Sequence, residues 1–325
     1  MRFTLTGSVA ALALTASMAL SQDTVELIYS DTVAEGDIRT ETLRSAFGAC
    51  LGAGFDFQSY HGATLFAQGT ELTAMQRGNL DMGNLAIFDF YNQVPSTKIL
   101  GAPFLFRDYD HMRAVFDSDL LDDMLAEIEA EIGVKILAFP YIGARHFGYR
   151  GEDRIMEPAD LNGVKLRMPP GEGWQQVGRA MGATTVPVPF TEVYTALQTG
   201  AIDGQDNGFP AVRSMKFNQV ITHIGKTGHL VASNLFTISL DKWNALTPEQ
   251  QVTVQSCADK FEAALDQVTL TQENKLEADM IANGLDVYTP NLDAFVENVK
   301  AVYAAEGEDA DWPEGLFDTI GAFGR

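Results

Sequence analysis

Positive charge is scarce in this sequence. The 325 residues include only 22 lysines and arginines against 44 aspartates and glutamates, and the formal net charge is −22 at pH 7. A field of this sign repels nucleic acid and acidic membrane surfaces, so we expect no nucleic-acid partner. It also repels organic anions, so a site for an anion needs its own local positive charge. Arginines that fall inside motifs therefore carry extra weight.

Common catalytic and metal-binding motifs are also missing. The sequence has no Gly-x-Ser-x-Gly elbow and no phosphate loop ending in Gly-Lys-Ser/Thr. Its histidines lack metal-ligand spacing, and even His223 and His229 miss the i, i+4 face of a zinc-binding helix. Among 44 acidic residues chance carboxylate pairs are inevitable, so no catalytic pair stands out. We expect no enzyme activity, no cofactor and no metal.

Long apolar runs are absent except at the N-terminus. There, Arg2 precedes an apolar run from about Val9 to Leu20, which ends in a small-x-small cleavage pattern at Ser21. The run is too short to span a membrane without a stop-transfer flank. We therefore expect a secretory signal peptide over residues 1–21 and a mature chain that begins at Gln22.

Cysteine is nearly absent, with Cys50 and Cys257 as the only two. In an oxidising compartment two cysteines can form a disulfide. Both could equally be buried small hydrophobic residues. The sequence leaves the choice open.

Strand and helix patterns alternate along the chain. Strands are expected at 25–29, 55–60, 134–139, 164–168 and 230–240, and residues 80–83 lead into a further strand; helices are expected at about 36–51, 70–77, 109–117 and 120–132. The alternation favours a parallel α/β sheet, and the pattern restarts after Asp153 as a second unit. With no repeats and no Gly/Ser linker, we expect two interdigitated α/β domains. Domain I comprises 22–142 plus 231–270, and domain II comprises 143–230 plus 271–325.

A long helix is expected to begin at Pro248. Val254, Cys257, Phe261, Leu265 and Val268 form one apolar stripe at helical spacing. The pattern continues to about Ala282 and stops at Asn283-Gly284. Such a helix is ~50 Å long and could bridge both domains. The alternative is two helices with a break between them.

The stretch from Gly163 to Pro210 is the most informative part of the chain. Apolar residues alternate with Lys165 and Arg167, which predicts a strand that a Pro-Pro-Gly turn ends. Arg167 therefore lies near a strand terminus, where α/β proteins place ligand contacts. Its planar guanidinium matches a carboxylate with two hydrogen bonds. The alternative is a surface arginine in a salt bridge.

This stretch resembles the solute-binding proteins of TRAP (tripartite ATP-independent periplasmic) transporters, the DctP-like family. The resemblance rests on these segments: Leu166-Arg167-Met168-Pro169, Gly182-Ala183, Pro189 to Tyr194, Ala196 to Gly200, and Ile202 to Asn207. Upstream, residues 80–83 and 103–106 also look like that family. One departure is Gly208, where the family usually has proline.

The resemblance implies a two-domain periplasmic-binding-protein-like fold with a long helix spanning both domains. It also implies a periplasmic receptor that closes around a small organic anion and delivers it to a membrane permease driven by an ion gradient. We expect the receptor to act as a monomer.

The resemblance also assigns roles to single residues. Arg167 matches the main carboxylate-binding arginine, Asn207 an asparagine that donates to the same carboxylate, and Arg145 a second arginine facing the ligand. Phe190 matches an apolar wall. The alternatives are an interdomain salt bridge for Arg145 and a plain turn residue for Asn207.

Three further residues are expected at the same cleft. Trp174 follows the Pro-Pro-Gly turn closely enough to line the cleft beside Arg167, although ordinary core packing is the alternative. Asp31 and Gln68, at strand and turn ends of the first domain, could bond ligand hydroxyls.

The ligand is expected to be a sugar acid such as a uronate, because an aromatic face suits a sugar ring. An aromatic or keto acid is the close rival, and a C4-dicarboxylate comes third. A secreted hydrolase is the alternative of a different class, and the receptor of a two-component sensor is another.

Overall fold

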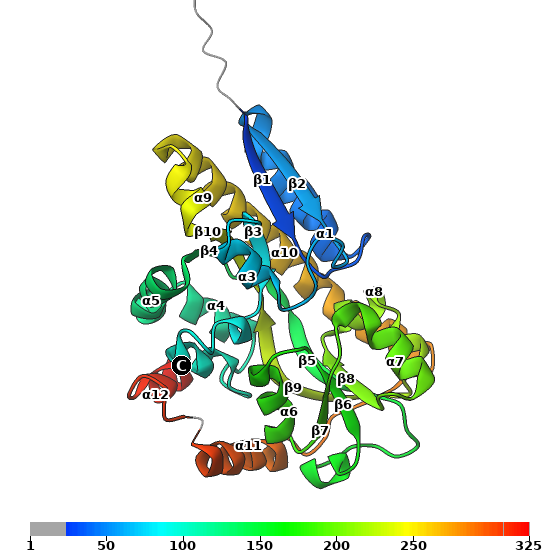
Figure 1. The fold of residues 1–325 in the computed structure, drawn as a ribbon. Coiled ribbons are helices and arrows are strands. Elements are labelled where there is room, and N and C mark those ends of the chain that lie inside the picture. Colours follow the sequence, from blue (N-terminus) through cyan, green and yellow to red (C-terminus); the bar gives the residue numbers. More distant parts are fainter. Residues whose placement is uncertain (1–23, 308, 325) are drawn as a thin grey trace, which may run out of the picture.

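The computed structural model describes residues 24–307 and 309–324, and their strands form two separate sheets (Figure 1). The expected signal peptide lies outside these residues. The first sheet has the order β2-β1-β3-β10-β4 and the second β11-β9-β5-β8-β6-β7. We call the first sheet with its surrounding helices the first unit, and the second sheet with its surrounding helices the second unit.

The first sheet contains β1 (Val25–Ser30), β2 (Phe55–Tyr60), β3 (Met82–Leu85), β4 (Val134–Ala138) and β10 (Leu235–Ser239). The second contains β5 (Tyr141–Tyr149), β6 (Lys165–Met168), β7 (Thr184–Pro187), β8 (Gly204–Asn207), β9 (His223–Ser233) and β11 (Asp286–Tyr288). The α-helices are α1 (Ile38–Thr42), α2 (Ala49–Leu51), α3 (Glu71–Gln76), α4 (Tyr109–Phe116), α5 (Asp122–Ile132), α6 (Glu172–Ala180), α7 (Val193–Thr199), α8 (Phe209–Ser214), α9 (Leu240–Ala245), α10 (Pro248–Ala282), α11 (Leu292–Glu306) and α12 (Leu316–Ala322). None of these helices is both long and apolar enough to span a membrane.

The expectation of a parallel sheet is only partly correct, because both sheets are mixed. β1 runs parallel to β2 and β3, and β6 runs parallel to β7 and β8. However, β10 is antiparallel to β3 and β4, and β5 is antiparallel to β8 and β9. The cause is the path of the chain, which leaves the first sheet from β4 into β5 and returns from β9 into β10.

The two crossing segments lie side by side. Ala138 of β4 pairs with Phe236 of β10, and Tyr141 of β5 pairs with Ser233 of β9. The strand expected over 230–240 is therefore divided at Asn234 into β9 and β10, which belong to different sheets. Short crossings inside the fold join the units, as the lack of a flexible linker predicted.

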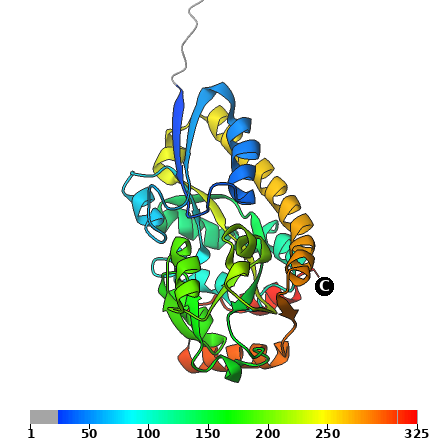
Figure 2. The same ribbon diagram turned by 90° about the vertical axis from the view of Figure 1, so that its right-hand side faces the viewer.

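The long helix is confirmed as one uninterrupted element, α10, of 35 residues. It begins with a capping box, in which Thr247 Oγ1 accepts from Gln250 N and Gln250 Oε1 accepts from Thr247 N, followed by Pro248 in the first turn. Gly284, with φ 94°, ends the segment. Figure 2 shows α10 running along one side of both units.

The C-terminal helix α12 falls in the range expected for domain II and contacts the first unit around α4. His111 Nε2 lies 2.7 Å from Ile320 O, and Arg107 donates to Gly321 O and Phe323 O. α11 remains with the second unit, where Asn298 donates to Ala180 O.

The two cysteines form a disulfide. Cys50 of α2 and Cys257 of α10 are bonded with their Cα atoms 5.6 Å apart and 207 residues apart in sequence. The bond fastens the first unit to the long helix, beside the apolar stripe of Phe261 and Leu265.

Reduction of this disulfide should lower the free energy of unfolding by about 2–5 kcal/mol, because it releases a long loop in the unfolded chain. Urea unfolding with and without reductant measures the loss. The doubly substituted Cys50→Ser/Cys257→Ser protein is the control, and its unfolding midpoint should not respond to reductant. An equal response of both proteins would contradict the prediction.

Candidate functional site: a cavity between the two units

A cavity lies between the units and is lined by both. The first unit contributes Thr32, Val33, Arg39, Gln68, Gly69, Glu71, Asn84, Ala86 and Asp89. The second contributes Ile142, Gly143, Arg145, Arg167, Pro169, Pro170, Trp174, Phe190, Asn207, Gly208 and Ala211, and Asn234 lies at the crossing. Of the seven residues expected at the cleft, six line this cavity, and Asp31 does not.

Arg167 is a buried cation without an acidic partner. It projects from β6, between Leu166 and Met168, and only 1% of it is exposed. Its Nε donates to Val188 O at 2.7 Å and a terminal nitrogen to Gln68 Oε1 at 3.3 Å. Within the described residues no carboxylate forms a salt bridge with it. Burial lowers the pKa of Arg167 to about 9; the Asp206 charge raises this pKa, and repulsion from Arg145 lowers it further. It therefore stays charged at neutral pH.

Arg145, in contrast, is already paired. Its Nε donates to Asp206 Oδ2 at 2.7 Å, and Nη2 donates to both Oδ1 and the backbone oxygen of Asp206. His229 Nε2 lies 3.3 Å from the same carboxylate. Although burial opposes ionisation, the Arg145 guanidinium and the His229 hydrogen bond hold the pKa of Asp206 below its usual range. Arg145 thus lines the cavity with its charge largely neutralised inside the second unit.

Trp174 and Phe190 form the aromatic part of the wall. The Trp174 ring lies between two partners, with its centroid 3.9 Å from that of Phe88 and 4.7 Å from Arg145 Cζ. Phe190 is buried, and the Cζ atoms of Arg39 and Arg167 each lie 5.8 Å from its ring centroid. Both rings contact arginines, and both residues line the cavity.

Asn207 ends β8 at the cavity wall, and its Nδ2 donates to Gln205 Oε1 at 2.5 Å. Gly208 follows with φ −73°, a value that proline also adopts. A Cβ atom at position 208 would lie 3.1 Å from Ala144 O. The glycine therefore serves close backbone packing.

Gln68 connects the two units. Its Oε1 accepts from the backbone N–H of Phe190 at 2.7 Å as well as from Arg167. The side chain therefore crosses the cavity from the first unit to the second. This is a different contact from the hydroxyl binding expected of it.

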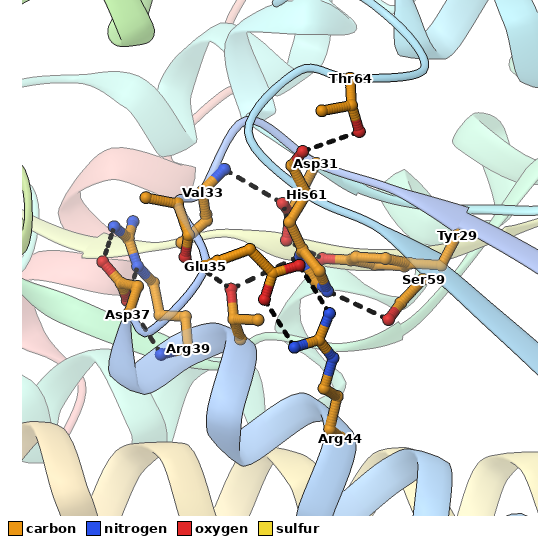
Figure 3. A network of polar contacts seen from close by, with 12 residues as sticks. Tyr29, Asp31, Val33, Glu35, Asp37, Arg39, Arg44, Ser59, His61 and Thr64 are labelled. Carbon is orange, nitrogen blue, oxygen red and sulfur yellow. Dashed lines mark hydrogen bonds and ion pairs between the residues drawn. The ribbon is translucent and has the colours of Figure 1, made fainter.

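Asp31 lies behind the cavity, in the polar network of Figure 3. Its carboxylate accepts from Tyr29 Oη at 2.9 Å and Val33 N at 3.0 Å, and it lies 3.0 Å from His61 Nδ1. The network orders the loop that brings Thr32 and Val33 to the cavity. These partners hold the carboxylate, and Asp31 is not among the residues that line the cavity.

Sequence reasoning missed two acidic residues on the first unit's wall. Glu71, in the first turn of α3, accepts from Gly69 N at 2.7 Å, and Asp89 accepts from Ala86 N at 2.8 Å. Burial raises the pKa of Glu71 to about 7 and that of Asp89 to about 6. The wall opposite Arg167 thus presents carboxyl oxygens, and no local sequence pattern marks them because their burial arises only in the fold.

The Glu71 carboxyl should make the ligand-free protein less stable as the pH rises. Its folded pKa is above the unfolded value, so its contribution is fully present below about pH 4.5 and is lost as the pH rises through about 7. A shift of this size corresponds to on the order of 3 kcal/mol. Urea unfolding of wild type and Glu71→Gln at pH 5 to 8 isolates this group, and the variant should gain relative to wild type as the pH rises. Parallel pH profiles would contradict the prediction.

Two α/β units around a cavity with a buried arginine indicate a solute receptor. The comparisons with known proteins identify the same class of protein. Residues 39–309 match the family described as bacterial extracellular solute-binding protein, family 7 (DctP). A solute-binding protein of Verminephrobacter eiseniae is 33% identical over 237 residues, covering 73% of this chain and 70% of that protein. The sialic acid-binding periplasmic protein SiaP of Vibrio cholerae is 29% identical, covering 75% of each.

A solved structure extends the likeness to the whole fold. The TRAP periplasmic solute-binding protein of Roseobacter denitrificans with bound 3-deoxy-D-manno-oct-2-ulosonic acid (KDO) is 37% identical, with a TM-score of 0.90, covering 93% of this chain and 100% of that one. The chain belongs to the DctP family of TRAP solute-binding proteins. It is a periplasmic receptor that works with a TRAP membrane permease, and it is not an enzyme.

Proposed function

We propose that the cavity binds a sugar acid whose carboxylate pairs with Arg167. The observation that supports this most strongly is a fully buried guanidinium with no acidic partner among the described residues, at the wall of a cavity. A carboxylate supplies the missing countercharge, and each charge-assisted hydrogen bond contributes about 1.5–3 kcal/mol. Asn207 lies at the same wall and is proposed as a further donor to the carboxylate.

The opposite wall favours a ligand rich in hydroxyl groups. Glu71, Asp89 and Asn84 offer oxygen acceptors there. A C4-dicarboxylate would bring its second negative charge toward two acidic side chains, which is unfavourable. An aromatic acid would place an apolar ring against these polar groups, which is unfavourable. Hydroxyl groups satisfy them, while Trp174 and Phe190 suit the C–H faces of a sugar.

Related receptors support this class of ligand. The 37% identical protein of Roseobacter denitrificans holds KDO, and another receptor from that organism, 26% identical, holds β-D-glucuronate. We therefore take uronates and KDO as the first ligands to test. The receptor is proposed to act as a monomer, because a single chain supplies the entire cavity.

Closure of the two units around the ligand is part of the proposal. The units are joined by the β4–β5 crossing, the β9–β10 crossing and α10, an arrangement that suits a hinge. Gln68 spans the cavity and contacts Arg167 and Phe190 N. We assign these two contacts to the closed state.

A thermal-shift screen tests this function. The panel contains D-glucuronate, D-galacturonate, KDO, L-gulonate, benzoate, pyruvate and succinate, with D-glucose as the neutral control. A ligand at 100 times its dissociation constant stabilises the folded protein by about 2.7 kcal/mol. We expect such a shift from at least one sugar acid and none from glucose. Stabilisation by succinate or benzoate alone would contradict the proposal.

A further inference from the structure

The segment that leads from the first sheet into β5 also forms part of the cavity wall. Ile142, Gly143 and Arg145 line the cavity within a few residues of the crossing. On one side this segment pairs with β9, with register shifts between Tyr141 and Gly143 and between Arg145 and Phe147. On the other side the backbone of β8 pairs with residues 146–149 and not with residues 141–145. The side of this segment away from β9 is therefore open to contacts from another element.

That element is α10, which presents a row of polar side chains to the crossing. Glu262, Asp266, Thr269 and Glu273 follow one another at intervals of four, three and four residues, which places them on one face of the helix. Each of these side chains forms a hydrogen bond with the backbone of the crossing. The three carboxylates accept: Glu262 from Phe139 N at 2.6 Å, Asp266 from Tyr141 N at 2.7 Å and Glu273 from Ala144 N at 2.9 Å. Thr269 Oγ1 donates to Tyr141 O at 3.2 Å.

Glu273 is the member of this row nearest to the cavity wall. Its Oε1 accepts from Ala144 N, between the cavity residues Gly143 and Arg145, and its Oε2 accepts from Tyr141 Oη at 2.9 Å. Gly143 has φ 107°, and a Cβ atom there would lie 3.1 Å from Glu273 Oε1. The glycine thus permits both the backbone conformation and the approach of the carboxylate.

We propose that Glu273 is a positioning residue for the ligand cavity, which holds the Ile142–Arg145 wall against α10 and so aims Arg145. It contacts the backbone of the wall and is not itself a residue that lines the cavity. The inference rests on the proposed function in one respect, namely that this wall contacts a ligand. The hydrogen bond from Ala144 N to Glu273 does not depend on the proposed function.

Glu273→Ala removes both acceptors, whereas Glu273→Gln keeps an oxygen that can accept from Ala144 N. Titration with KDO and D-glucuronate should show affinity about tenfold weaker for the alanine variant and within about threefold of wild type for glutamine, because small displacements of a binding group have large effects. Glu277→Ala, which removes the acceptor of Lys226 one turn further along α10, is the matched control and should bind like wild type.

A second measurement needs no ligand. Amide hydrogen exchange of the ligand-free protein should be at least about tenfold faster in peptides covering 139–146 for Glu273→Ala, and near wild type for Glu273→Gln and Glu277→Ala. If the alanine variant melts earlier but exchanges normally in this segment, the residue has only a general structural role and the inference is wrong. If no sugar acid binds wild type, the proposed function fails, while the exchange result still decides the role of Glu273.

Discussion

Arg167→Ala should nearly abolish binding of the sugar acid while leaving the fold intact. Loss of one partner from a buried hydrogen-bonded charge pair costs about 2–5 kcal/mol of binding free energy, which corresponds to at least roughly thirtyfold weaker affinity. Without ligand, the variant should be as stable as wild type or more stable, because the residue removed is a buried cation with no acidic partner. Calorimetric titration and urea unfolding measure the two effects separately.

Two further variants sharpen this test. Arg167→Lys keeps the charge but loses the planar guanidinium, and we expect binding at least about tenfold weaker, or ~1.4 kcal/mol. Arg179→Ala is the matched control, since Arg179 is exposed on α6 of the same unit and pairs with Glu172 at 2.7 Å. It should bind like wild type. Normal affinity of Arg167→Ala would remove this arginine from the site.

Asp206→Asn should destabilise the protein by about 3–5 kcal/mol, because it leaves Arg145 buried without its countercharge. Both side chains are buried, and their closest contact is 2.7 Å. The substitution also frees the guanidinium that rests on Trp174, so ligand affinity should fall as well. Urea unfolding at pH 7 measures the loss of stability.

The control for Asp206 is a salt bridge of the same length on the surface. Glu172→Gln breaks the exposed pair with Arg179 and should cost less than about 1 kcal/mol. The double variant Arg145→Met/Asp206→Leu removes both charges and should recover most of the lost stability without recovering ligand binding. Equal, small effects of Asp206→Asn and Glu172→Gln would contradict the assignment of a buried ion pair.

Local signals in the sequence predicted much of the fold. Pro248 at the start and Asn283-Gly284 at the end lie within a few residues of the helix ends, so the sequence predicted both ends of α10. The antiparallel crossings were not, because the pairing of Tyr141 with Ser233 joins residues far apart in the chain. The partnership of Cys50 and Cys257 also depends on tertiary distance, which spacing alone does not reveal.

The residues of the site also fall into two groups, those that the sequence predicted and those that only the structure reveals. Arg167, Asn207 and Phe190 belong to one continuous stretch of motif, and the structure places all three at one cavity. Glu71 and Asp89 carry no motif, and their raised pKa values arise from burial that the fold creates. Asp31 ends a strand as expected, but its carboxylate is held by Tyr29 and the loop behind the wall, which only the three-dimensional structure reveals.

The most direct test of the central claim is a crystal structure of the protein with the sugar acid that gives the largest thermal shift. We predict that the ligand lies between the two units, with its carboxylate within hydrogen-bonding distance of the Arg167 guanidinium and its hydroxyl groups toward Glu71 and Asp89. A ligand whose carboxylate points to the first unit's wall, or which lies outside this cavity, would contradict the account.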